Sequence, residues 1–184
     1  MKTIPLPSRR QVLILSAAGC ASLLAGCRST PVSSPVPGNI EDETAAFLPL
    51  VNGLRAKNGK STLVADGAAA KAAMFQANRM AQNEKMSHLI GFGDSFGKRM
   101  LESGVQLPAA ENIAMRQQSV EAAFEAWVNS PHHLENMLGP YHGLGVAVAR
   151  LPAKGNVPYW AMVLSGAPRP ATPARIGVLG ISIG

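Results

Sequence analysis

The first apolar stripe of the chain follows the spacing of three to four residues that is typical of an α-helix. It consists of Phe47, Leu50, Val51 and Leu54. Acidic residues at 41–43 precede the stripe and Asn58 and Gly59 follow it, and such residues are common at the beginning and the end of a helix. Pro49 lies within this span, where it removes one backbone hydrogen bond. The pattern therefore predicts a helix that Pro49 kinks or shortens.

Two further stripes predict two further helices, each behind a residue that can cap it. Asp66 precedes a stripe of small side chains, which permit close approach to a neighbouring element. Ser119 precedes a stripe of larger side chains. The stripes are Ala69, Ala73, Ala77 and Met80 in the second helix, and Val120, Ala123, Phe124, Trp127 and Val128 in the third.

Two short segments after these helices, 144–149 and 159–164, carry apolar residues at consecutive rather than alternate positions. Strands of this kind are covered on both faces. Pro152, Gly155 and Asn156 lie between the segments and indicate a hairpin connection. Helices followed by a small sheet with both faces covered predict an α/β fold, a three-layer α-β-α sandwich with a small antiparallel sheet.

Residues 1–27 are typical of an export signal. A charged start is followed by an apolar stretch at 12–18, which Gly19 and Cys20 interrupt. The stretch is shorter than the roughly 20 residues that a membrane-spanning helix needs. The run Ser-Arg-Arg-Gln-Val-Leu at 8–13 resembles a twin-arginine signal, with Val where Phe is usual.

The end of this segment, Leu-Ala-Gly-Cys at 24–27, resembles the bacterial lipobox. The resemblance implies that the thiol of Cys27 carries a lipid and that Cys27 becomes the first residue of the mature protein. A second possible lipobox ends at Cys20, and a secretory peptide with incidental cysteines is the other alternative. We therefore expect an exported protein that is lipid-anchored in the cell envelope, with the membrane as its partner.

Composition divides the rest of the chain into three parts. Residues 28–40 are rich in Ser, Thr, Pro and Gly with a single charge, which indicates a flexible tether. Residues 41–167 are expected to form one domain, because roughly 100 to 150 residues already bury a core. Residues 168–184 form a tail whose apolar end is too short to cross a membrane. We expect the protein to be a monomer.

The positive net charge does not indicate a nucleic-acid partner. Three of the 17 basic residues and none of the 11 acidic ones precede Cys27, so the net charge falls from +6 to +3 after the export signal. Aromatic residues make up only 5%, and no run of five like charges occurs. Both cysteines lie in the export signal, which excludes a disulfide or a thiol nucleophile in the domain.

The residues that could form a metal or acid–base site are four histidines and one glutamate. They are His88, His132, His133, His142 and Glu111.

An ordered set of short motifs resembles the CAP superfamily of cysteine-rich secretory proteins, antigen 5 and plant pathogenesis-related proteins. The motifs are Asn52–Arg55, Met80, Ser87–His88, Glu111–Ala114, Trp127–Ser130, His133, Asn136, Gly143–Val146 and Tyr159–Trp160. They span roughly residues 44–166. The chain is similar to the bacterial branch of the family, which lacks disulfides.

This resemblance implies an α-β-α sandwich with a cleft of two histidines and two glutamates, in which some members bind a divalent metal. Carried over, His88 and His133 are the metal-binding pair for a weakly held zinc ion, and Glu111 is one glutamate. The second glutamate falls on Ser130. Glu125 is a poor substitute, because five residues along a helix turn its side chain about 140° away.

Each cleft residue also has a structural interpretation. The two histidines could bond to backbone at a helix end, and Glu111 could be a buried carboxylate that accepts backbone N–H bonds. The residues expected to support the cleft are Asn112, Ser130 and Asn136. Those expected at the surface are His132 and His142, and those expected in the core are Trp127 and Trp160.

Three functions stay open. The favoured one is a non-catalytic envelope module that binds a lipid, a sterol-like molecule or a cell-wall fragment, since the resemblance implies lipid binding in some members. The second is a metal-dependent hydrolase, such as a peptidase, with His88, Glu111 and His133 as catalytic residues around a metal-bound water. The third is a structural or partner-binding role. The missing second carboxylate disfavours catalysis.

Overall fold

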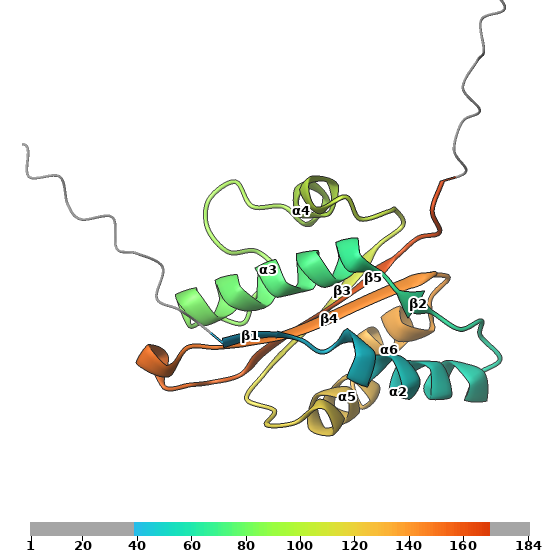
Figure 1. Ribbon diagram of the computed structural model, residues 1–184, viewed down its shortest axis with the longest axis horizontal. Coiled ribbons are helices and arrows are strands. Elements are labelled where there is room, and N and C mark those ends of the chain that lie inside the picture. The colour runs from blue at the N-terminus through green and yellow to red at the C-terminus, as the bar shows by residue number, and fades with distance from the viewer. Residues whose placement is uncertain (1–38, 170–184) are drawn as a thin grey trace, which may run out of the picture. The chain divides into compact units, whose positions relative to one another are not determined.

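The computed structural model describes residues 39–169, which form a five-stranded sheet between two layers of helices (Figure 1). The strands are β1 (Asn39–Asp42), β2 (Val64–Ala65), β3 (Ala110–Met115), β4 (Gly143–Arg150) and β5 (Tyr159–Ser165). The helices are α2 (Thr44–Lys57), α3 (Gly67–Asn83), α4 (Phe96–Ser103), α5 (Val120–Val128) and α6 (Pro131–Leu138), with a short 3₁₀ turn, η1 (Pro152–Lys154). The predicted three-layer α-β-α sandwich is confirmed.

Several predicted features lie outside the described residues. They are the export signal with Cys20 and Cys27, the tether up to residue 38 and the tail from residue 170. Among the residues that are described, no helix is both long and apolar enough to cross a membrane.

The strands follow the order β1-β4-β5-β3, and β2 pairs with the start of β4. All pairs are antiparallel except the short β2–β4 pair. β4 and β5 form the centre of the sheet. Every residue of these two strands except Arg150 is buried, as the continuous apolar segments predicted. The expected connection between them contains η1, and Gly155 and Asn156 both adopt left-handed backbone angles. β3 is an edge strand.

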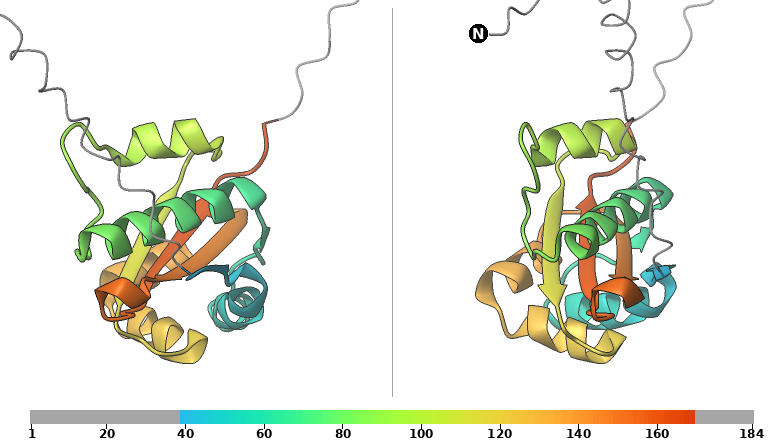
Figure 2. Two further views of the ribbon diagram at one scale, coloured as in Figure 1. Left: turned by 60° about the vertical axis from the view of Figure 1, so that its left-hand side comes forward. Right: turned by 90° about the vertical axis from the view of Figure 1, so that its left-hand side faces the viewer.

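Each face of the sheet has its own core. α3 and α4 lie on one side, and α2, α5 and α6 lie on the other (Figure 2). Side chains of β4 alternate between the cores: Ala147 and Ala149 face α3, whereas Val146 and Val148 pack with α2 and α5. The same alternation in β3 and β5 fixes which residues reach which layer.

α3 packs on the sheet at very short range. Asp66 caps it, as predicted, and accepts hydrogen bonds from the Ala68 and Ala69 N–H groups. The predicted stripe of small residues is fully buried against β4 and β5. Gly145 permits this approach, because a Cβ atom at Gly145 would lie 2.0 Å from the backbone nitrogen of Ala70.

α2 begins later than the sequence pattern indicated. Residues 41–42, expected to begin the helix, belong instead to β1, which starts at Asn39 within the segment assigned to the tether. The helix begins at Thr44, whose N–H donates to Asp42 Oδ1 at 2.9 Å. Pro49 is accommodated without interrupting the helix, which ends at Lys57, close to the predicted stop.

α5 is capped by Ser119, as predicted, and its Oγ accepts from the Ala122 N–H at 3.2 Å. Trp127 of this helix packs 5.4 Å from the Phe47 ring and donates to the Ile113 carbonyl at 3.2 Å. Trp160 is equally buried and also packs against Phe47. Both tryptophans are therefore core residues, as expected.

Candidate functional site

The candidate site is built around the edge strand β3. Successive residues of a strand point to opposite faces of a sheet. Glu111 therefore points to the α3 side, where it bonds to His88, and Asn112 points to the α6 side, where it bonds to the His133 carbonyl. Two neighbouring positions of one strand thus reach the two segments that carry the predicted histidines.

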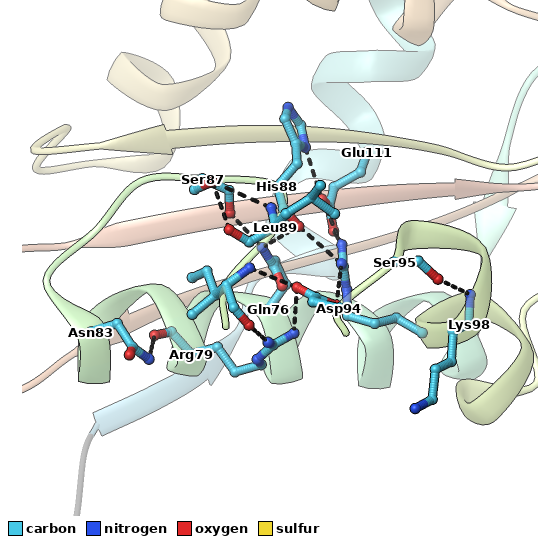
Figure 3. A network of polar contacts seen from close by, with 12 residues as sticks. Gln76, Arg79, Asn83, Ser87, His88, Leu89, Asp94, Ser95, Lys98 and Glu111 are labelled. Atoms are coloured by element: carbon cyan, nitrogen blue, oxygen red, sulfur yellow. Dashed lines mark hydrogen bonds and ion pairs between the residues drawn. The ribbon is translucent and has the colours of Figure 1, made fainter. Parts of the chain in front are cut away.

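His88 lies in the loop that follows α3. Its Nδ1 is 2.8 Å from Glu111 Oε1, and the Glu111 side chain is only 2% exposed, against 49% for His88. Figure 3 shows the imidazole ring with its other nitrogen pointing away from the polar network. The buried Gln76 side chain of α3 holds the loop backbone, since its Nε2 donates to the Ser87 carbonyl at 2.7 Å.

Arg99 of α4 binds the Glu111 carboxylate. Its Nη2 donates to both carboxylate oxygens at 2.9 Å, and its Nη1 donates to the His88 carbonyl at 2.9 Å. The Arg99 side chain is 4% exposed. Glu111 thus accepts hydrogen bonds from side chains. This differs from the alternative considered in the sequence, a buried carboxylate that accepts bonds from backbone N–H groups. Arg99 is not among the site residues predicted from the sequence.

Asp94 balances the charge of Arg99 within the same network. Its carboxylate is 3.1 Å from Arg99 Nη1 and 3.0 Å from Arg79 Nη1. Arg79 also donates to the Ile90 carbonyl. Burial alone would raise the pKa of Asp94, but hydrogen bonds from the Ile90 N–H, Arg79 and Arg99 outweigh burial and lower it to about 2.

The low pKa of Asp94 predicts a loss of stability in acid. A carboxylate whose pKa is lower in the folded than in the unfolded chain stabilises the fold above its unfolded value, and this contribution is lost as the pH falls through the folded pKa. We expect the Asp94→Asn variant to be less stable than the wild type at about pH 5, and the difference to shrink by about 2 kcal/mol towards pH 2. Urea unfolding of both proteins at several pH values measures this. A constant difference would contradict the assignment.

His133 lies on the other side of β3, near the start of α6. Asn112 Nδ2 donates to its carbonyl at 3.0 Å, and Asn136 Nδ2 donates to Asn112 Oδ1 at 2.8 Å. Burial, followed by the charges of His132 and His88, lowers the pKa of His133. Its imidazole is therefore mostly neutral at neutral pH.

The remaining residues considered in the sequence lie from α5 to the start of β4. Ser130 is the N-cap residue of α6, but its side chain makes no capping bond. Glu125, His132 and His142 are exposed. Asn112 and Asn136 join β3 to α6, so two of the three residues expected to support the cleft make side-chain contacts beside the site.

A three-ligand metal centre does not fit this arrangement. The Glu111 carboxylate already accepts three hydrogen bonds, from Arg99 and from His88, of the about four that it can accept. Over residues 39–169, no three His, Cys, Asp or Glu side chains are grouped closely enough to hold an ion. Catalytic zinc usually has three protein ligands. Weak binding of a divalent metal by His88 and His133 alone stays a prediction.

The match to a family model decides the classification. The model described as the cysteine-rich secretory protein family matches residues 48–164, which is more than half of the chain and includes His88, Glu111 and His133. The chain belongs to this family. Its CAP domain thus includes His88 and His133, the two histidines predicted to bind a metal, and strand β3, which lies between them.

Two bacterial proteins are similar to this CAP domain in sequence or structure. The uncharacterized protein YkwD of Bacillus subtilis (strain 168) is 27% identical over 117 residues, which are 63% of this chain and 46% of that protein. An extracellular protein containing a SCP domain from Bacillus anthracis str. Ames is similar in structure, with a TM-score of 0.58 and 26% identity, over 68% of this chain and 40% of that one. The chain therefore covers less than half the length of either relative.

A third comparison supports the fold alone. An outer surface protein from Borrelia burgdorferi has a TM-score of 0.61 at 20% identity, over 72% of this chain and the whole of that chain. The CAP sandwich is thus shared with a protein whose sequence is only distantly similar.

Proposed function

We propose that this CAP domain is a non-catalytic ligand-binding module on the outer side of the membrane, held in the cell envelope by a lipid on Cys27, and that its ligand is an amphiphilic lipid. Membership of the family supports the module, and the similar protein from Bacillus anthracis is an extracellular one. The lipobox at residues 24–27 supports the anchor.

The observation that carries the proposal is an apolar groove between α2 and α5. It has a volume of about 390 Å³, within the range of about 300–1,000 Å³ for small-molecule sites. Its lining residues are Pro49, Leu50, Gly53, Leu54, Lys57, Phe124 and Val128. Lys57 is the one charged residue of this lining. An apolar wall with a cation at one side suits an acyl chain with an anionic head group.

A larger groove near the start of α2 and α3 suits an anionic lipid less well. It has a volume of about 520 Å³ and is lined by Asp42 and Asp66 together with small and apolar residues. Two carboxylates repel an anionic head group, and both already bond to backbone N–H groups at helix starts. Charge therefore favours the α2–α5 groove.

The hydrolase alternative has less support. It requires Glu111 to act on a metal-bound water, yet both Glu111 oxygens accept hydrogen bonds from Arg99. The second family carboxylate is replaced by Ser130. A cell-wall fragment as ligand and a purely partner-binding role are outcomes that the following experiment distinguishes.

Filling the groove is expected to abolish lipid binding. A Cβ atom at Gly53 would meet no heavy atom within 4 Å, so the Gly53→Leu variant should fold and place its side chain in the groove. We expect the full-length chain to bind a fluorescent long-chain fatty acid and the variant to bind it at least about tenfold more weakly. Fluorescence titration measures both affinities.

Gly97→Leu is the matched control, because Gly97 is also helical and has open space around it, but lies in α4. It should bind like the wild type. Equal binding by Gly53→Leu and the wild type would overturn the groove assignment. Failure of the wild type to bind fatty acid, together with binding of a soluble peptidoglycan fragment, would select the cell-wall alternative, and binding of neither would favour the partner-binding role.

A further inference from the structure

One guanidinium group holds His88 by two separate routes. Arg99 Nη1 donates directly to the His88 main-chain carbonyl at 2.9 Å. Arg99 Nη2 donates to both oxygens of Glu111, and Glu111 Oε1 in turn is 2.8 Å from His88 Nδ1. The first route fixes the backbone of His88, and the second fixes the position of the carboxylate that bonds to its ring.

We infer that Arg99 is a positioning residue for the His88 imidazole. A carboxylate bound at both oxygens by one planar guanidinium cannot rotate without breaking two charge-assisted hydrogen bonds. Glu111 is therefore a fixed acceptor beside His88 Nδ1. Because the hydrogen bond at one ring nitrogen decides which nitrogen carries the proton, this arrangement places a proton on Nδ1.

Glu111 belongs to a connected network of four charged groups. Arg79 and Arg99 supply two positive charges, and Asp94 and Glu111 supply two negative charges, with all four joined by contacts of 3.1 Å or less. The four charges balance one another, and of the two arginines it is Arg99 that contacts Glu111. In the neutral ring with its proton on Nδ1, Nε2 of the half-exposed His88 side chain is an acceptor for a hydrogen-bond donor of a ligand. This inference goes beyond the proposed lipid groove and does not depend on it.

The fold of the loop does not by itself require the bonds between Arg99 and Glu111. Asp94 Oδ2 accepts from the Ile90 N–H at 2.7 Å, and Arg79 bonds to both Asp94 and the Ile90 carbonyl. Gln76 holds the Ser87 carbonyl. These contacts hold the loop against α3 without the bonds between Arg99 and Glu111. The separate role of Arg99 is therefore to orient Glu111.

The test is the protonation pattern of the His88 ring. Long-range ¹H–¹⁵N spectra of the full-length chain, labelled with ¹⁵N at histidine and recorded at about pH 8, distinguish Nδ1–H from Nε2–H imidazoles. The His88→Gln variant assigns the signals. We expect Nδ1–H at His88 in the wild type, loss of this form in Arg99→Gln, a mixture of both forms in Arg99→Lys, and unchanged spectra for His142 in both variants.

Arg79→Gln is the matched control, because it removes a cation of the same network that does not touch Glu111. It should keep Nδ1–H at His88. An Nε2–H form in the wild type would overturn the inference without any variant. Retention of pure Nδ1–H in Arg99→Lys, or an equal change in Arg79→Gln, would also overturn it, so the result stands even where Arg99→Gln fails to fold.

Discussion

Replacement of Gly145 by alanine is expected to lower the free energy of unfolding by about 3 kcal/mol or more. The added Cβ atom would lie 2.0 Å from the nitrogen of Ala70 and 2.2 Å from the carbonyl carbon of Ala69. Both are backbone atoms of α3, so no flexible side chain can move aside. α3 would have to lift away from β4, which would loosen the whole buried face of the helix.

Urea unfolding of the Gly145→Ala variant checks this expectation. Gly97→Ala is a suitable control, since Gly97 lies in helix α4 with nothing within 4 Å of the added atom. The control should be as stable as the wild type or gain up to about 1 kcal/mol, because alanine favours a helix over glycine. A Gly145→Ala variant with the stability of the wild type would show that α3 and β4 are not in close contact.

Substitution of Arg55 by methionine is expected to cost about 4 kcal/mol of unfolding free energy. Arg55 is 1% exposed and is the last buried residue of α2. Its Nε donates to the Ser61 carbonyl at 2.6 Å, and its Nη1 donates to the carbonyls of Met137 and Gly139 at 2.7 and 2.9 Å. Methionine would fill most of the volume but would leave three carbonyls without their donor.

The Arg55→Lys variant separates charge from geometry. A lysine keeps the positive charge but cannot match the planar donors of arginine, so it should lie between the wild type and Arg55→Met in thermal or urea unfolding. Lys154→Met is the control, because Lys154 forms an exposed ion pair with Glu84 that contributes at most about 1 kcal/mol. An Arg55→Met variant as stable as this control would contradict the proposed role.

The elements that the sequence predicted well are those whose burial repeats along the chain. α3 shows the helical period in its alanines, and β4 and β5 show continuous apolar residues because helices cover both faces of the sheet. Capping by Asp66 and Ser119 could also be predicted from the sequence, because a capping side chain bonds to the first turn of the helix that directly follows it. The resemblance to the family added the positions of His88, Glu111 and His133.

The polar network could not be predicted, because its contacts join positions that only the tertiary fold brings together. Arg99 and Asp94 look like ordinary surface charges in the sequence, yet both side chains are 4% exposed. β3 was missed for a related reason: Glu111 and Asn112 interrupt its apolar residues, and each is satisfied by a partner far away in the chain. β1 was missed because it begins at the end of the segment rich in proline and serine that was predicted to be a tether.

The positions at which the chain enters and leaves the sheet determine how the fold carries mechanical load. Asn39, the first described residue, pairs with Arg150 at one end of β4, whereas Ser165 pairs with Gly143 at the other end. Tension between these two points therefore runs along the strands, while the hydrogen bonds of β1 and β4 lie across them. The four residue pairs of this ladder are loaded together in shear rather than opened one by one, a geometry that resists pulling at these two points.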